Sequence, residues 1–216
     1  MGPRPRREHL AAGCQVWRET SARLGLCEVR TDLVLGRPPQ QTWAMTVLIR
    51  EARSDDVALI QGLELDAGKR FVDIGLDSIA GDEPTSTALL RTHIDASTAW
   101  VAVDDIDRIV GAAWASIVDG EGHLDQLSVA VDTGRRGVGR ALIEQVCTWA
   151  AAEGLDAVTL TTFRDVPFNG PFYERCGFRV IDPDLYGPQL AAIRQLECDR
   201  GIDVVSRVAM RRRLER

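Results

Sequence analysis

The sequence predicts an α+β fold with a mixed, mostly antiparallel central sheet flanked by helices. Three observations lead to this fold class. Strand-like stretches at 98–103 and 109–118 are separated by the acidic turn 104–107, which indicates an antiparallel hairpin. After residue 131 the hydrophobic period changes from two to that of a helix. A β-branched stretch at 157–163 follows that helix, so the sheet also contains one β-α-β crossover.

Length and composition favour one globular domain. The chain has 216 residues, of which 45% are apolar and 27% charged, enough for one packed core and few for two. No apolar run approaches the roughly 20 residues that cross a bilayer. The basic N-terminus lacks the apolar core of a signal peptide. We therefore expect a cytoplasmic protein without a membrane partner.

Residues 1–44 differ from the rest of the chain. They contain Pro–Arg clusters and carry seven Arg against four acidic residues. The stretch 47–50 indicates a first strand, so we expect the main domain to cover residues 45–216. Residues 1–44 are then either a poorly ordered extension or an upstream stretch wrongly included in the reading frame.

The charge balance of the main domain is acidic. Residues 45–216 hold nineteen basic against twenty-eight acidic residues, a balance of −9. This makes nucleic acid an unfavourable partner and suits a cationic substrate such as an amine, although acidity also serves solubility alone. The five cysteines form no C-x-x-C pair, so we expect reduced, mostly buried thiols and no metal site.

The first half of the main domain contains helix and strand patterns in turn. The segment 54–56 is typical of a helix start with Ser54 as N-cap, and apolar residues continue at helical spacing to Leu63. Glycines and a proline break 68–84 into short helical pieces and loops. The hairpin 98–118 follows, and then a third strand, 124–131, in which three apolar residues alternate on one face: Leu127, Val129 and Val131.

The second half alternates helices and strands. A helix begins at Val138, where apolar residues recur on one helical face, and it ends at Gly154. The later elements that we expect are a strand at 157–163, a helix at 167–175, a strand at 178–181, a helix at 190–200 and a strand at 204–210.

The strongest motif is the glycine-rich segment 134–142 between the third strand and its helix. Such a turn presents unpaired N–H groups at the positive end of a helix, which binds a phosphate or pyrophosphate. Arg136 and Arg140 can add charge. A Walker loop would need Gly-Lys-Ser/Thr, and the dinucleotide fingerprint would need a small residue in place of Leu142. Without its context, the segment would equally be a plain tight turn.

Two motifs in the correct order resemble those of the GNAT superfamily of N-acetyltransferases. The segment 125–142 resembles its acetyl-CoA-binding motif, and the segment 169–178 (NGPFYERCGF) resembles its second motif, which ends in Phe/Leu-Tyr-x-x-x-Gly-Phe. The segment 49–56 is similar to the family's opening. The resemblance covers about residues 45–213 and implies a GNAT fold, acyltransferase activity and acetyl-CoA as the cosubstrate.

The loop departs from the family pattern at one position. The family's loop is Gln/Arg-x-x-Gly-x-Gly/Ala, and alignment of its last two positions with Gly137 and Gly139 places Gly134 where Gln or Arg is expected. The N–H group of Gly134 remains. We expect Arg135 or Arg136 to replace the missing side chain.

The resemblance also implies the cofactor contacts. On the strand they are Leu127, Ser128, Val129 and Val131, whose main chain would bind the pantetheine arm as an added strand. In the turn they are Arg135, Arg136, Gly137, Val138, Gly139, Arg140 and Ala141. Asn169 is the last, and a helix N-cap is an equal alternative for it.

Acetyl transfer to an amine needs a base and an acid. A lysine-like amine with a pKa of about 10.4 is almost wholly protonated at neutral pH, so a carboxylate or a water relay has to remove a proton. The candidate bases are Asp125, which aligns with an acidic residue of some family members, Glu64 and His123; each could also be a surface residue. By resemblance, Tyr173 protonates the departing coenzyme A thiolate; the alternative is a packing aromatic.

These observations predict an N-acetyltransferase. It would move an acetyl group from acetyl-CoA to a primary amine, on a small molecule or a peptide, by direct attack in a ternary complex. The alternatives are a non-catalytic acyl-CoA-binding sensor or interaction module on the same fold, and an acyltransferase for a longer acyl-CoA. The sequence identifies no acceptor, and it is compatible with a homodimer.

Overall fold

The computed structural model describes residues 47–215, so the predictions for residues 1–44 lie outside it. Within the described residues, seven strands form one sheet in the order β1-β2-β3-β4-β5-β7-β6. Their bounds are β1 Leu48–Glu51, β2 Ala99–Val103, β3 Ile109–Val118, β4 Glu121–Val129, β5 Ala157–Phe163, β6 Arg179–Val180 and β7 Arg207–Arg213. The pair β4–β5 is parallel and the other pairs are antiparallel. The mixed, mostly antiparallel sheet is therefore confirmed.

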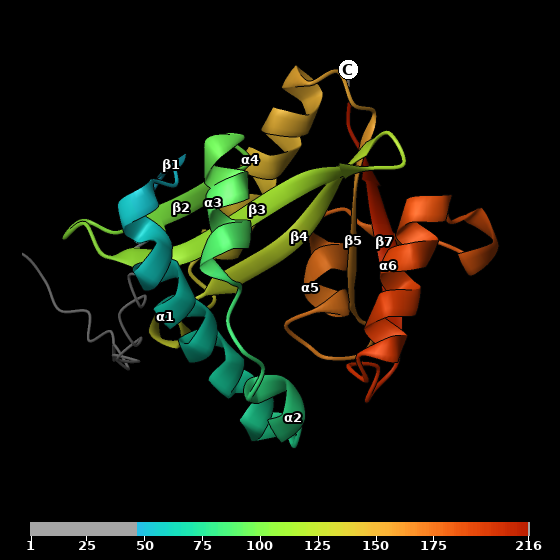
Figure 1. The fold of residues 1–216 in the computed structure, drawn as a ribbon, viewed down its shortest axis with the longest axis horizontal. Coiled ribbons are helices and arrows are strands. Elements are labelled where there is room, and N and C mark those ends of the chain that lie inside the picture. The colour runs from blue at the N-terminus through green and yellow to red at the C-terminus, as the bar shows by residue number, and fades with distance from the viewer. Residues whose placement is uncertain (1–46, 216) are drawn as a thin grey trace, which may run out of the picture. The chain divides into compact units, whose positions relative to one another are not determined.

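Helices cover both faces of the sheet (Figure 1). One face carries α1 (Val57–Gly68), α3 (Thr87–Asp95) and α6 (Pro188–Asp199). The other face carries α4 (Val138–Ala152) and α5 (Gly170–Arg175). Between α1 and α3 the chain forms a 3-10 helix, Lys69–Ile74, and the short α2 (Asp77–Ala80), where the sequence predicted short helical pieces.

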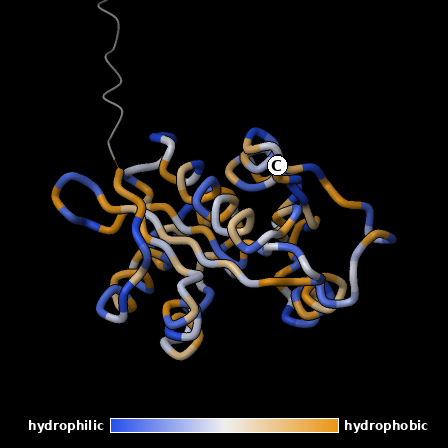
Figure 2. Tube along the Cα trace, turned by 90° about the horizontal axis from the view of Figure 1, so that it is seen from above, coloured by the Kyte–Doolittle hydropathy of each residue, from blue (hydrophilic) through white to orange (hydrophobic). Residues whose placement is uncertain are grey.

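The core consists of layers on the two faces of the sheet. In β2, Trp100 packs in the cluster with α4, whereas Val101 packs in the cluster with α1 and α3. Successive side chains of a strand point to opposite faces, so a strand covered on both sides is apolar throughout, as all five buried residues of β2 are. Seen from above, the hydrophobic segments run along these central strands (Figure 2).

A glycine in β3 lets α4 approach the sheet closely. A side chain at Gly111 would place its Cβ 2.7 Å from Val138 Cγ1 and 2.9 Å from Leu142 Cδ1. Separations below 3.0 Å are not tolerated without movement, so glycine allows the first turns of α4 to lie directly on β3. This contact fixes the start of α4, where the glycine-rich turn ends.

Several predicted boundaries are wrong: the helix predicted at 167–175 begins at Gly170, the strand predicted at 204–210 is Arg207–Arg213, and two further errors have a clear physical cause. The strand predicted at 124–131 ends at Val129, because the Val131 N–H donates to Asp66 Oδ2 (3.0 Å) and not to the sheet, and Val131 lies in a 3-10 turn. Ser54 is not the N-cap of the first helix. The N–H group of Arg53 instead donates to Asp56 Oδ2 (2.7 Å), and Asp56 also pairs with Arg50.

The cysteines of the described residues are free thiols. Cys147 and Cys176 are buried, as expected, and burial raises the pKa of the Cys147 thiol to about 11, which makes it unreactive. Cys198 is exposed and donates a hydrogen bond to Asp203. Cys14 and Cys27 lie outside the described residues.

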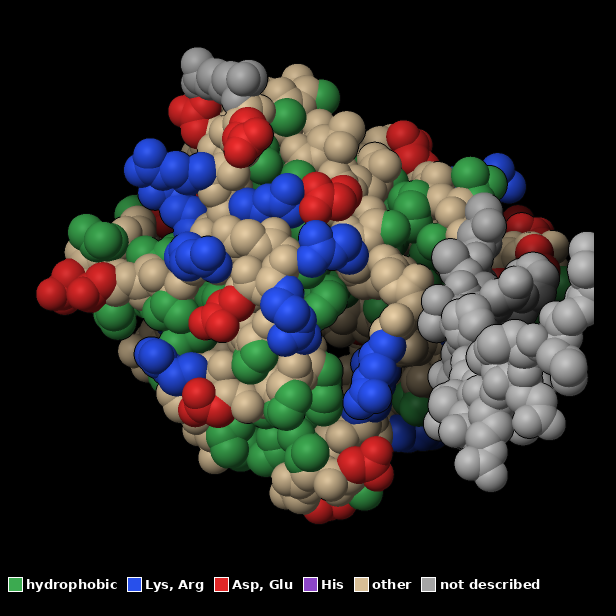
Figure 3. All heavy atoms as spheres, turned by 180° about the vertical axis from the view of Figure 1, so that it is seen from behind, with side chains coloured by type: hydrophobic (Ala, Val, Ile, Leu, Met, Phe, Trp, Pro, Cys, Tyr) green, Lys and Arg blue, Asp and Glu red, His purple; other side chains and the backbone are tan. Residues whose placement is uncertain are grey.

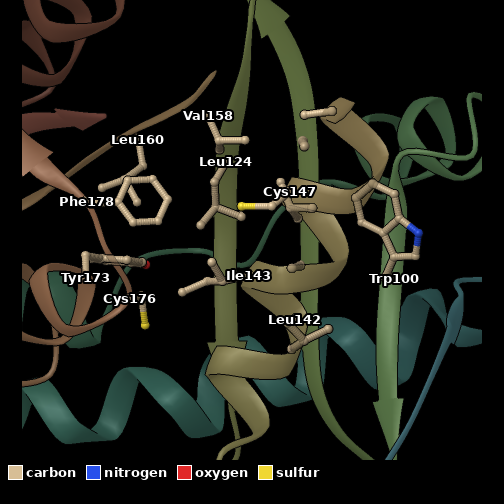
Figure 4. Packing of buried hydrophobic residues seen from close by; sticks show 14 of the residues in the cluster. Trp100, Leu124, Leu142, Ile143, Cys147, Val158, Leu160, Tyr173, Cys176 and Phe178 are labelled. Atoms are coloured by element: carbon tan, nitrogen blue, oxygen red, sulfur yellow. The ribbon is translucent and has the colours of Figure 1, made fainter. Parts of the chain in front are cut away.

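We expect Phe178→Ala to destabilise the protein by about 3–5 kcal/mol, because a fully buried phenyl group leaves a cavity on truncation. Phe178 packs beside Leu160 and Tyr173 in the cluster that also contains residues of α4 (Figure 4). Urea denaturation monitored by circular dichroism measures this loss. Phe178→Leu, which keeps most of the volume, should lose clearly less; equal losses for both variants would contradict this account of the core.

Candidate active site

The candidate site is a cleft that opens where β4 and β5 diverge. The two strands pair only from Gly122 with Val158 to Leu124 with Leu160, although β4 continues to Val129 and β5 to Phe163. Beyond that point the strands separate, as the ribbon shows (Figure 1). The cleft has a volume of about 1190 Å³, and residues of α1, β4, the glycine-rich turn, β5, α5 and α6 line it.

The free edge of β4 presents backbone groups to the cleft. The Ala130 N–H donates to the Val110 carbonyl (3.0 Å), and the register pairs Ser128 with Ala112. N–H groups of an antiparallel strand alternate between its two edges, so those of Leu127 and Val129 face away from β3. β5 has diverged at this level, and an extended ligand can therefore pair with β4 there.

The glycine-rich turn places the start of α4 at one end of the cleft. Gly137 has φ 88°, a left-handed conformation that favours glycine, and it directly precedes α4. The first N–H groups of a helix have no partner within the helix, so those of Val138, Gly139 and Arg140 are available to an anion. The Ala141 N–H is not, since it donates to the Gly137 carbonyl (3.0 Å).

Most of the predicted cofactor positions line this cleft. They are Leu127, Ser128, Val129, Arg135, Gly137, Val138, Gly139, Arg140 and Asn169. Three predicted positions do not line it: Val131, Arg136 and Ala141. The N–H of Val131 is bonded to Asp66, and that of Ala141 lies within the helix.

Arginines surround the opening of the site. Arg135, Arg140 and Arg175 line the cleft, and the Arg140 Nη2 atom donates to the Arg175 carbonyl (2.6 Å). On the face opposite to that of Figure 1, basic side chains gather around a hollow (Figure 3). Positive charge at this end of the cleft favours a phosphorylated ligand, whereas the chain as a whole is acidic.

Tyr173 of α5 lines the cleft from the side of the core. Its ring packs on Phe172 and Phe178 at centroid distances of 5.2 and 5.8 Å, and Figure 4 shows its hydroxyl end on the side of Leu124 and Ile143. The side chain is only 8% exposed, and burial raises the pKa of Tyr173. No hydrogen bond within residues 47–215 uses its hydroxyl group, so the protonated phenol is available to a ligand.

Asn169 precedes α5, and the oxygen of its side-chain amide has no hydrogen-bond partner within the described residues. Its Nδ2 atom donates to Thr162 Oγ1 (3.0 Å), while its buried Oδ1 atom has no partner within the described residues. Asn169 occupies the N-cap position, but its side chain makes no capping hydrogen bond. A buried polar atom without a partner costs free energy, which favours a ligand that donates to this oxygen.

Asp125 is the first residue of β4 beyond the part of the strand that pairs with β5. Trp114 pairs with Gln126 and Ala115 with Leu124, so Asp125 is a bulge residue, and a bulge redirects a side chain. Its carboxylate accepts a hydrogen bond from Ser116 Oγ (2.9 Å) and is open to the solvent of the cleft. The surrounding protein removes part of its hydration and raises the pKa of Asp125 to about 6.

Glu64 of α1 is a half-buried acid that also lines the cleft. Its carboxylate accepts from the Thr85 N–H (3.1 Å), from Thr85 Oγ1 (2.9 Å) and from Gln126 Nε2 (3.3 Å). Burial raises the pKa of Glu64, and these hydrogen bonds oppose the rise. With three donors engaged, the carboxylate connects α1 to β4 and to the segment before α3.

His123 of β4, two residues before Asp125, is buried and neutral. The Thr159 hydroxyl donates to the Gly122 carbonyl (3.1 Å), so it accepts from His123 Nδ1–H at 2.9 Å, which leaves the lone pair on Nε2. Burial lowers the pKa of His123 to about 4, although the charge of Glu197 opposes this. An imidazole with that pKa is a weaker base than Asp125.

Two groups of contacts in the cleft could not be predicted from the sequence, although the segment 67–71 with its packing Phe71 was a candidate to line the acceptor pocket. Phe71 contacts Phe163 and Phe168 edge-on, at 5.7 and 5.2 Å between centroids. On α6, the carboxylate of Glu197 forms ion pairs with Arg194 and Arg207. Neither group has a sequence motif, because its members come from separate elements that the fold brings together.

The divergent parallel strands, the glycine-rich turn after β4 and the tyrosine of α5 are the arrangement of the GNAT fold. The chain belongs to the acetyltransferase (GNAT) family of acyltransferase enzymes, whose model matches residues 69–178. Mycothiol acetyltransferase of Propionibacterium freudenreichii is 27% identical over 203 residues. That match covers 84% of this chain and 61% of the relative, so the chain spans about three fifths of the relative's length.

Solved structures of low sequence identity share the fold. An acetyltransferase of the GNAT family from Staphylococcus aureus superposes with a TM-score of 0.61 at 15% identity, over 79% of this chain and 100% of that chain. The PaiA N-acetyltransferase of Thermoplasma acidophilum, solved in complex with coenzyme A, gives 0.59 at 16% identity, over 78% and 99% of the two chains.

Two features are absent from residues 47–215. No group of three or more His, Cys, Asp or Glu side chains is arranged to hold a metal ion. No helix in this part of the chain is long and apolar enough to span a membrane.

Proposed function

We propose that this protein transfers an acetyl group from acetyl-CoA to a primary amine by direct attack in a ternary complex. One observation carries the proposal: a single cleft contains the free edge of β4, the N-terminus of α4 and the hydroxyl of Tyr173. These features suit a linear cofactor with an anionic end and a thioester end. The family membership supports acetyl transfer.

The residues of the cleft fit such a cofactor. The N–H groups at the start of α4 and the nearby arginines would hold its phosphates. The N–H groups of Leu127 and Val129 would pair with the amides of its pantetheine arm, as in an added strand. The orphan Oδ1 atom of Asn169 would accept a hydrogen bond from the same arm. When bound, acetyl-CoA supplies the activated acetyl group.

Asp125 is the proposed base. The amine nucleophile has to lose a proton as the C–N bond forms, and a carboxylate with a pKa of about 6 is ionised at neutral pH yet still basic. Glu64 is already bonded to three donors, so we assign it the role of positioning Gln126 and Thr85. Asp125 accepts the proton directly or through one water molecule.

Tyr173 is the proposed acid. As the C–S bond breaks, the sulfur gains negative charge, and a hydrogen bond from the phenol stabilises it. The buried site keeps Tyr173 protonated, since burial raises its pKa. The same apolar surroundings raise the proton affinity of a thiolate, so the proton can pass from the Tyr173 oxygen to the sulfur. When the products leave, solvent returns a proton to the phenolate and takes the amine proton from Asp125.

A cationic acceptor fits the wall beside α1. Six acidic residues line the cleft: Glu64, Asp73, Asp82, Glu83, Asp125 and Glu197, of which Glu197 is already paired with Arg194 and Arg207. The first four belong to α1 and the segment that follows it, and together with Asp125 they would attract a protonated amine, whereas Arg135 and Arg140 belong to the glycine-rich turn and the start of α4. The relative named mycothiol acetyltransferase is consistent with an acetyl acceptor of low molecular weight.

Calorimetry with acetyl-CoA, followed by a thiol-release screen over small amines and peptide N-termini, tests this function. We expect saturable binding of acetyl-CoA and amine-dependent release of coenzyme A. Tight binding without transfer to any amine would support the sensor and contradict the enzyme. Faster turnover with longer acyl-CoA thioesters would show that the transferred group is a longer acyl group and not acetyl.

A further inference from the structure

The glycine at position 134 is not required by its backbone. Gly134 has φ −56° and ψ 148°, a conformation that every amino acid adopts. The nearest obstacle to a side chain there is Arg70, because a Cβ atom on Gly134 would overlap the Nη2 atom of the Arg70 guanidinium. Glycine at 134 therefore leaves a space in the turn, and the guanidinium of Arg70 fills it.

Arg70 reaches this space from the opposite wall of the cleft. It lies in the 3-10 helix Lys69–Ile74 that follows α1, and its guanidinium lies 5.7 Å from the centroid of the Phe168 ring. Asp66, in the last turn of α1 just before this 3-10 helix, binds the residue that follows β4, since its Oδ2 atom accepts from the Val131 N–H at 3.0 Å. The Phe168 ring and the hydrogen bond between Asp66 and Val131 thus both help to hold Arg70 at the turn.

The guanidinium of Arg70 is available to an anion. Within residues 47–215 it forms no ion pair with a carboxylate, while Asp66 pairs with Lys69. Arg70 lines the same cleft as Gly137 and Gly139, and its guanidinium lies against Gly134, in the turn that leads into α4. A planar, permanently charged fork of donors at a helix N-terminus suits a phosphate group.

We propose that Arg70 binds the diphosphate of the cofactor and replaces the side chain that Gly134 lacks. This inference rests on the proposed use of acetyl-CoA. It assigns the replacing cation to a different element from the turn itself, in place of Arg136 and in addition to Arg135, which also lines the cleft. Arg136 does not line the cleft, whereas the Arg70 guanidinium already lies against the backbone of the turn.

Calorimetric titration of the Arg70→Gln variant with coenzyme A tests the proposal. We expect the Kd for coenzyme A to rise roughly tenfold or more, the usual effect of losing a charge-assisted hydrogen bond. S-acetylpantetheine, which lacks phosphate, should bind both proteins alike. Arg91→Gln is the matched control, because Arg91 is exposed on α3 and does not line the cleft. Unchanged affinity of Arg70→Gln for coenzyme A would overturn the proposal.

Variants at position 134 provide a second test, because they either obstruct the Arg70 guanidinium or supply an arginine in its place. Gly134→Ala should weaken coenzyme A binding by less than Arg70→Gln, because its Cβ shifts the guanidinium from its place but leaves the charge at the end of a flexible side chain. The double variant Arg70→Ala with Gly134→Arg should regain affinity relative to Arg70→Ala alone. Wild-type affinity in Gly134→Ala, with no gain in the double variant, would contradict the inference. Wild-type protein that fails to bind coenzyme A would instead refute the proposed function itself.

Discussion

Replacement of Tyr173 by Phe is expected to lower kcat roughly 100-fold, the usual contribution of a positioned acid, and to leave the Kd for acetyl-CoA nearly unchanged. The phenol donates only when the sulfur departs, so its loss affects the chemical step and not the binding of the cofactor. Steady-state kinetics and calorimetry on the same preparation separate these two effects.

The Tyr173→Phe change should also leave stability unaltered. The ring keeps its contacts with Phe172 and Phe178, and no described residue loses a hydrogen-bond partner. Tyr186→Phe is a matched control, because its hydroxyl accepts from the Ala209 N–H (3.3 Å) and Tyr186 does not line the cleft. Full activity in Tyr173→Phe, or equal losses of activity in both variants, would remove Tyr173 from the mechanism.

Replacement of Asp125 by Asn is expected to lower kcat/KM at neutral pH by roughly 100-fold and to change the pH profile. The wild-type rate should fall below pH 6, because the carboxylate, whose pKa is about 6, becomes protonated and can no longer accept a proton. Without the base only neutral amine reacts, so the variant's rate should rise about tenfold per pH unit up to the pKa of the amine.

The control for this prediction is Asp95→Asn, on an exposed acid at the end of α3 that does not line the cleft. Its pH profile should match the wild type. An acceptor amine of low pKa should lose less rate in Asp125→Asn than a strongly basic one, since less of it needs deprotonation. An Asp125→Asn profile that keeps the limb near pH 6 would assign that limb to another group.

Asp125→Asn should not destabilise the fold. The folded protein raises the pKa of Asp125 above its unfolded value, so the ionised carboxylate is less favourable in the folded state. This residue therefore lowers stability as the pH rises from about 4 to 6, and its amide analogue avoids that loss. Thermal unfolding at pH 7 should show an equal or higher Tm in the variant, which separates a catalytic defect from misfolding.

Patterns that act over short distances predicted most of the fold. The hairpin strands, the helix from Val138 and the strand 157–163 were predicted from period and turn residues alone, and β3 and β5 have the predicted bounds. The error at the end of β4 arose where a contact distant in sequence decides the local structure. Val131 continues the apolar alternation of β4, but Asp66 of α1 binds its N–H group, so the strand ends two residues earlier.

The candidate site was predicted where a motif covers it. Tyr173 and the turn at Gly137 have the expected place in the cleft because both belong to continuous segments. The bulge at Asp125 depends on the register with β3, and the approach of Arg70 to Gly134 depends on the path of the chain after α1. A glycine where the family has Gln or Arg indicates a missing side chain, but only the fold reveals which residue occupies its place.

The most direct test of the central claim is carbon NMR on the protein with acetyl-CoA labelled at the acetyl carbonyl and a primary amine that is active in the thiol-release screen. We predict that the thioester carbonyl signal is replaced by an amide carbonyl signal, at a rate that depends on the amine and falls strongly in Tyr173→Phe and Asp125→Asn. Persistence of the thioester signal with every amine, while acetyl-CoA remains bound, would contradict acetyl transfer at this cleft.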